Sequence, residues 1–190
     1  MDILDALTNR RAVYPRDFTG DPVPDDDIRT LLDAANWAPT HRYTEPWRFR
    51  VVRGDGLARL ADFMDSVVTE TVDDPEAAEA KRVRTRSKIE ASAAVLILSM
   101  QRDAGERVPA WEELAATAMA VQNLWLAGYH RGIGGYWSSP AAAIERIDRF
   151  TPLDEGERCL GFFYLGRRPD GDRPGRRFSS AEEKTRWVRA

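Results

Sequence analysis

Aromatic, imidazole and guanidinium groups are concentrated in one stretch, Asn36 to Phe49, with the sequence NWAPTHRYTEPWRF. It holds two tryptophans, His41 and charges of both signs, between an expected helix and an expected strand. Short loops held between two rigid elements often carry binding groups. An equally good interpretation of this stretch alone makes the tryptophans core residues and His41 a helix cap, because aromatic residues are common in cores.

A second stretch combines glycines with hydroxyl groups. Gly132, Gly134 and Gly135 come just before Tyr136 to Pro140, where two serines stand beside two aromatic residues. Glycine allows the backbone to approach a flat ligand closely. A plain glycine-rich turn explains the same residues, and this segment alone favours that simpler interpretation.

Arg10 and Arg11 are adjacent cations at the end of an expected helix from Asp2 to Asn9. Paired guanidinium groups suit a phosphate dianion, because each can donate two parallel hydrogen bonds. Cations at the C-terminus of a helix also complement its dipole. The spacing alone favours the dipole interpretation over a phosphate site.

Several other kinds of site lack their motif. One cysteine excludes an internal disulfide and a cysteine zinc cluster, and only two histidines are present. The chain has no phosphate-binding P-loop, no G-x-G-x-x-G after a strand and no H-E-x-x-H. A Ser-His-Asp triad is not excluded by residue counts, but no G-x-S-x-G elbow supports it.

The elements expected to position these groups alternate between amphipathic and buried segments. Helices are expected over 2–9, 25–37, 57–68, 76–92, 110–130 and 141–149, with a final helix capped by Ser179 and Glu182, and strands over 47–52, 93–99 and 160–165. The strand at 93–99 is continuously apolar, so we expect it to be buried on both faces. Helix 110–130 is apolar nearly all round, which indicates deep burial or a subunit interface. The glycines at 132–135 are expected to end it.

The bulk properties indicate one domain spanning residues 1–190, with enough length for a sizeable core. A net charge of −3 provides no general field to attract nucleic acid or an acidic membrane surface. The first residues lack the basic-then-apolar layout of a signal peptide, and no apolar run is long enough to span a bilayer. We therefore expect a cytoplasmic protein with neither nucleic acid nor membrane as a partner.

Four separated segments together resemble the nitroreductase-like family of FMN-dependent oxidoreductases, in its compact bacterial form. They are NRRA at 9–12, APTH with EPWRF within 38–49, GIGGYWSS at 132–139 and GFFYLGRRP at 161–169. The resemblance implies an α+β fold with a mostly antiparallel central sheet and helices on both faces. It also implies an intertwined homodimer with FMN in two clefts at the interface, where helix 110–130 would lie.

The resemblance assigns a phosphate site to residues at both ends of the chain. Arg10 and Arg11 match the arginines that hold the FMN phosphate and ribityl chain. Ala12 takes the third place of that motif, where many relatives carry serine, so one hydroxyl contact is absent. Arg176 or Arg177 matches a late basic residue on the phosphate.

The resemblance also assigns residues to the flavin ring. Trp37 and His41 match positions that reach FMN from the second subunit, although relatives often carry arginine at the place of Trp37. Trp137, Ser138 and Ser139 match the segment beside the ring, and relatives often have arginine where Ser138 stands.

The implied activity is hydride transfer from NADH or NADPH through FMN to a nitroaromatic, quinone or similar small-molecule acceptor, with ping-pong kinetics. In relatives, the segment matching Ala127 to Gly132 is associated with the nicotinamide cofactor. The flavin carries the chemistry, so no catalytic side chain and no metal are assigned. The alternative is a flavin-binding protein of the same fold with a flavin-consuming, dehalogenating or regulatory role.

Overall fold

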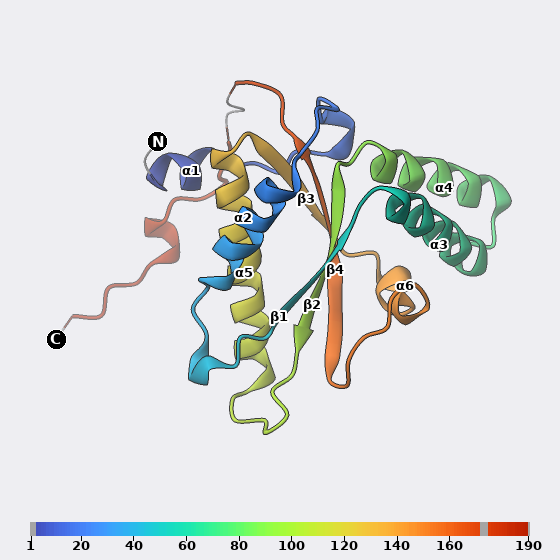
Figure 1. The fold of residues 1–190 in the computed structure, drawn as a ribbon. Helices are drawn as coiled ribbons and strands as arrows, with labels where there is room; N and C mark the ends of the chain where they lie inside the picture. The colour runs from blue at the N-terminus through green and yellow to red at the C-terminus, as the bar shows by residue number, and fades with distance from the viewer. Residues whose placement is uncertain (1–2, 172–174, 190) are drawn as a thin grey trace.

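Four antiparallel strands form the central sheet of the computed structural model, which describes residues 3–171 and 175–189 (Figure 1). The strands are β1 (Trp47–Val52), β2 (Ala94–Gln101), β3 (Ile133–Ser138) and β4 (Glu157–Arg167), in the spatial order β1-β2-β4-β3. The central strand β2 is buried on both faces from Ala94 to Met100, as its apolar run predicts. The edge strands β1 and β3 flank the two apolar central strands.

Helices cover both faces of the sheet, which confirms the α+β prediction (Figure 1). One face packs against α2 (Asp25–Asn36) and α5 (Ala110–His130), and α1 (Ile3–Asn9) contacts α5. The other face packs against α3 (Asp55–Thr71) and the short α6 (Ala141–Ile144), and α4 (Pro75–Glu90) packs on α3. The expected first helix began at Asp2, which lies outside the described residues.

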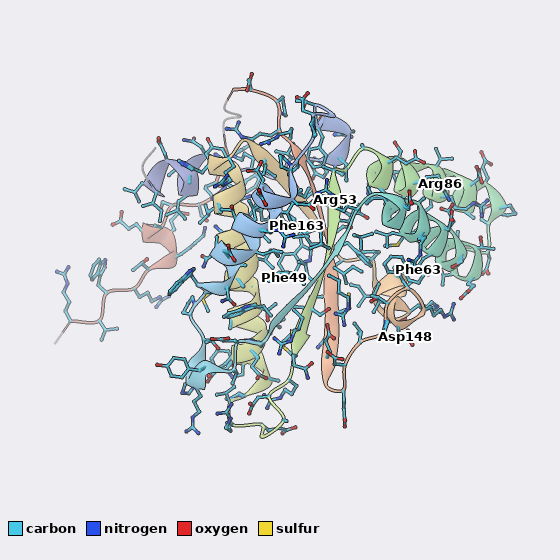
Figure 2. All side chains as sticks on the ribbon, in the orientation of Figure 1. Phe49, Arg53, Phe63, Arg86, Asp148 and Phe163 are labelled. Atoms are coloured by element: carbon cyan, nitrogen blue, oxygen red, sulfur yellow. The ribbon has the colours of Figure 1, made fainter. Side chains whose placement is uncertain are left out.

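Two clusters of buried side chains hold these layers together, one on each face of the sheet. Figure 2 labels Phe163 in the cluster beneath α5 and Phe63 in the cluster beneath α3. Because adjacent side chains in a strand point to opposite faces, β4 supplies both clusters: Phe163 to the first, Phe162 and Tyr164 to the second. The same alternation decides towards which face of the sheet each β3 side chain points.

The glycine-rich segment after α5 differs from its prediction. Helix α5 ends at His130 as expected, but Ile133–Ser138 then pairs with β4 as an edge strand rather than a loop. Glycine is needed here because a Cβ at Gly135 would overlap the ring of Phe163 on the neighbouring strand. Because Gly134 and Gly135 have no side chains, the sequence of this strand shows no apolar alternation.

Two expected helices are shorter than predicted. The segment 141–149 divides into α6 and a 3-10 turn at Ile147–Arg149. The final helix is a single 3-10 turn, Glu182–Lys184, and its capping contacts lie one residue later than predicted. The Glu183 N–H donates to Ser180 Oγ at 3.1 Å, and the Ser180 N–H donates to Glu183 Oε1 at 2.9 Å.

Candidate ligand-binding site

The first feature of the site is a pocket where the start of the chain meets the C-terminal end of α5. Residues from α1, α5, β3 and the segment after β4 line it: Asn9, Arg10, Arg11, Val13, Trp125, Tyr129, Ile133, Gly134, Arg168, Pro169 and Gly171. Segments from both ends of the chain therefore build one site. We call it the arginine pocket.

Local structure fixes the direction of the arginines. Helix α1 ends at Asn9, so Arg10 and Arg11 begin an extended segment that runs beside β3. The Val13 N–H donates to the Gly135 carbonyl at 3.0 Å, which ties this segment to the outer edge of β3. A Cβ at Gly134 would crowd Val13, so the glycine permits this close approach.

Two aromatic side chains of α5 support the guanidinium groups. The Arg10 guanidinium lies over the Trp125 ring, 4.2 Å from its centroid, and Arg168 lies over the Tyr129 ring at 4.6 Å. Positions 125 and 129 are one turn apart on the helix, so both rings face the pocket. Stacking of this kind orients a guanidinium while leaving its N–H groups available to a ligand.

The arginine pocket carries excess positive charge. The Nε atoms of Arg10, Arg11 and Arg168 are buried and have no hydrogen-bond partner in residues 3–171 and 175–189. The pKa of Arg10 is lowered by burial and by the charges of Arg11 and Arg177. Arg11 donates to the Arg10 carbonyl at 2.7 Å, a backbone contact that brings no opposite charge. Unpaired buried donors and clustered cations are costly, and a phosphate monoester would compensate both.

Of the predicted phosphate residues, the structure brings Arg10 and Arg11 into one pocket, and Ala12 follows them as an exposed residue. Arg176 is exposed and lies over the Phe178 ring at 4.9 Å. Arg177 is also exposed, but its charge contributes to the lowered pKa of Arg10. Between these two alternatives, the electrostatics favour Arg177.

Sequence reasoning did not assign Arg168, Trp125 or Tyr129 to the site. Arg168 lies inside the GFFYLGRRP segment, directly after a buried strand. That position is the sequence feature that could have assigned it to the site. Trp125 and Tyr129 belong to an apolar helix, so their pattern predicts packing rather than support of a cation.

The outer edge of β3 leads away from the arginine pocket towards Ser139. The Gly135 carbonyl points outward to Val13, and alternation along an antiparallel strand places the N–H and carbonyl of Trp137 on the same edge. The Trp137 indole donates to the Leu160 carbonyl at 3.2 Å, which fixes the ring. Ser138 is half-buried and Ser139 is exposed.

Trp37 and His41 do not line the arginine pocket. Trp37 ends α2 with 86% of its surface exposed, and His41 Nδ1 lies 2.7 Å from Glu112 Oε2 in the first turn of α5. Glu112 and Trp125 are about 20 Å apart along the helix, from its rise per residue. A single chain therefore does not bring His41 to the arginine pocket.

Comparisons with known proteins agree with this fold. The model of the Nitroreductase family matches residues 7–167. The chain is 33% identical over 164 residues to "Putative NAD(P)H nitroreductase YfhC" of Bacillus subtilis, covering 85% of this chain and 82% of that protein. It superposes on the crystal structure of a nitroreductase-like family protein from Bacillus cereus with a TM-score of 0.83, 27% identity and coverage of 100% and 97%.

The fold is also that of a protein crystallised with a nucleotide. The FMN-dependent nitroreductase NfnB of Mycobacterium smegmatis, solved in complex with NADPH, gives a TM-score of 0.76 at 19% identity, covering 98% of this chain and 97% of that chain. The family match and the relatives named as NAD(P)H nitroreductases identify the chain as an oxidoreductase. The chain belongs to the nitroreductase family.

Other kinds of site are not found in the described part of the chain. Residues 3–171 and 175–189 contain no group of three histidine, cysteine or acidic side chains that could hold a metal ion. Among the same residues, no helix is long and apolar enough to cross a membrane.

Proposed function

We propose that the protein is an FMN-dependent oxidoreductase that passes electrons from NADH or NADPH to a small nitroaromatic, quinone or similar acceptor. Three guanidinium groups with buried, unpartnered Nε atoms in the arginine pocket carry this proposal, because a phosphate monoester fits them. Family membership supplies the class of reaction.

Arg10, Arg11 and Arg168 would hold the FMN phosphate. The free edge of β3 would face the flavin ring, with the backbone N–H of Trp137 available as a donor beside it. Bound FMN supplies the two-electron chemistry, so no side-chain nucleophile is required. Arg10 and Arg11 would then govern cofactor affinity more than the rate of the chemical step.

A homodimer is part of this proposal. Large apolar side chains are exposed on the side of the molecule that carries α2 and α5: Trp37 (86%), Tyr43 (89%) and Trp111 (67%). Such exposure is unusual for a monomer and indicates a contact surface. A second copy packed on this surface would supply Trp37 and His41 to the partner's flavin. The single domain over residues 1–190 and the cytoplasmic location remain predictions.

The visible spectrum of the purified protein, recorded before and after anaerobic addition of NADH or NADPH, tests the proposal. Flavin absorption that bleaches with the donor and returns with a nitroaromatic or quinone is the expected result. Flavin bands that never bleach would contradict the reductase activity. A colourless protein that takes up no added FMN would contradict the cofactor assignment itself.

A further inference from the structure

A second pocket lies on the opposite face of the sheet, between α4 and the end of β3. Its apolar wall includes Met64, Val68, Ala143 and Tyr164, and Ser138 also lines it. Three cations of α4 also line it: Lys81, Arg84 and Lys88. We call this the basic pocket, and none of its residues belongs to the arginine pocket.

The three cations lie on one side of α4. Positions 81, 84 and 88 are three and four residues apart, so their side chains project from the same face of the helix. Two of the three lysines in the whole chain are in this group. Lys88 approaches the ring of Tyr136, with its Nζ 5.8 Å from the centroid.

Other cations of the same helix differ because they have acidic partners. Arg82 pairs with Glu79 at 2.5 Å, and Arg86 pairs with Asp62 and Asp65 at 2.8 and 2.5 Å. Figure 2 labels Arg86 between α3 and α4. On α4, therefore, Arg82 and Arg86 are paired with carboxylates, whereas Lys81, Arg84 and Lys88 line the basic pocket.

In the described part of the chain, no acidic group forms an ion pair with Lys81, Arg84 or Lys88. The pKa of Lys88 is lowered by burial and by the charge of Arg84. Cations gathered on one helix face repel one another, and the half-buried Lys88 also loses hydration, which its contact with the Tyr136 ring offsets only in part. An anionic ligand would compensate it.

We propose that the basic pocket binds the carboxylate of an anionic aromatic acceptor, with its ring against the apolar wall. The combination of aliphatic side chains with cations on one side suits an aromatic acid better than a fully polar sugar phosphate. Ser138 lines this pocket and also ends the β3 edge beside which we place the flavin ring. The inference rests on the proposed function, because the acceptor must reach the flavin.

The electron balance for a nitro acceptor is simple. One NAD(P)H supplies a hydride and solvent supplies a proton, which together provide two electrons and two protons. One N–O bond of the nitro group breaks, water leaves, and a nitroso compound and NAD(P)+ remain. The carboxylate is unchanged in this step, so its only role is recognition.

Matched acceptors test the inference. The rates with 4-nitrobenzoate and the neutral 4-nitrobenzyl alcohol are compared in the native holoenzyme, in Arg84→Gln and in Arg84→Gln/Lys88→Met. We expect kcat/KM for nitrobenzoate to fall about tenfold or more in the double variant, as for a lost charge-assisted contact, while the alcohol changes little. Arg82→Gln removes a charge from the same helix outside the pocket and should leave the ratio unchanged. An equal fall for both acceptors, or an unchanged ratio, overturns the inference.

Binding of benzoate provides a readout that does not depend on turnover. Titration should raise the melting temperature of the native protein and of Arg82→Gln, but not that of the double variant. Reduction of the alcohol without any benzoate binding would overturn the inference and leave the proposed function standing. Variants that lose affinity for NADPH but not NADH, with benzoate binding unaffected, would instead assign these cations to the nucleotide. If the protein oxidises no NAD(P)H, the benzoate titration alone decides whether the pocket takes carboxylates.

Discussion

Arg10 lies over the indole of Trp125 at 4.2 Å, and this contact joins the first loop of the chain to the last third of α5. The indole face attracts the cation electrostatically without forming hydrogen bonds to the guanidinium edge. The Nε of Arg10 remains buried and without a partner in the described residues. The residue is therefore oriented and desolvated in advance of its ligand.

Loss of one pocket arginine should weaken FMN binding. Arg168→Gln removes a guanidinium with a buried, unpartnered Nε, so the dissociation constant for FMN should rise about tenfold or more, equivalent to roughly 1.5–3 kcal/mol. Arg176→Gln is the matched control, because Arg176 is exposed and lies over Phe178. Quenching of FMN fluorescence on titration measures both. Equal losses in the two variants would contradict the position of Arg168 in the site.

Removal of the Trp125 ring should weaken FMN binding through its effect on Arg10. Trp125→Leu keeps an apolar side chain but removes the ring, so FMN affinity should fall by about 0.5–2 kcal/mol, the range of a cation–π contact. Trp125→Phe should retain part of this effect, since it restores a ring face. In the background of Arg10→Gln, Trp125→Leu should change FMN affinity little, and an additive double-variant effect would show that Trp125 acts independently.

The parts of this fold that follow from sequence are those with strong local patterns. The buried run of β2 and the length of α5 are read directly from apolar residues. Strand β3 is not, because Gly134 and Gly135 have no side chains to display a period, and only contact with Phe163 and Val13 explains them.

The candidate site likewise has a part that the sequence predicts and a part that only the tertiary structure shows. Arg10 and Arg11 are recognisable as adjacent cations at a helix end. Arg168 becomes part of their pocket only because β4 ends beside α5, and that proximity is a tertiary contact. The basic pocket was not anticipated either, since a charged helix is usually a solvated one and the pairing of Arg86 with carboxylates of α3 is visible only in three dimensions.

Two glycines should respond differently to a methyl group. A Cβ at Gly135 would overlap the rigid Phe163 ring, so Gly135→Ala should reduce the free energy of unfolding by about 1–3 kcal/mol, as overpacking does. A Cβ at Gly175 would meet the end of the flexible Arg11 side chain, so Gly175→Ala should weaken FMN binding with little loss of stability. Urea unfolding of the FMN-free protein, together with FMN titration, separates the two effects. A stable Gly135→Ala variant would contradict the close packing of β3 on β4.

Charge placed on the exposed apolar surface should disturb assembly and cofactor binding together. Trp111→Glu introduces a carboxylate where 67% of the indole is exposed, and a buried unpaired charge in an interface is costly. We expect light scattering to show more monomer and FMN titration to show weaker binding, because the partner would supply part of the site. Val83→Glu is a control at another exposed apolar residue, on α4. A variant that is monomeric but binds FMN normally would contradict a site completed by the partner.

Alkaline pH should destabilise the fold through Tyr164. This phenol is buried beneath α3, and burial, followed by the nearby Tyr136, raises its pKa to about 12 from an ordinary 10.0. The folded chain therefore holds the phenol proton more tightly than the unfolded chain does. The resulting stability is complete below pH 10 and declines as pH rises towards 12, by up to about 3 kcal/mol. Urea unfolding at pH 8 and pH 11 should show a smaller alkaline loss in Tyr164→Phe than in the native protein. The same loss in both proteins would mean that other groups, and not this buried phenol, set the alkaline limit of the fold.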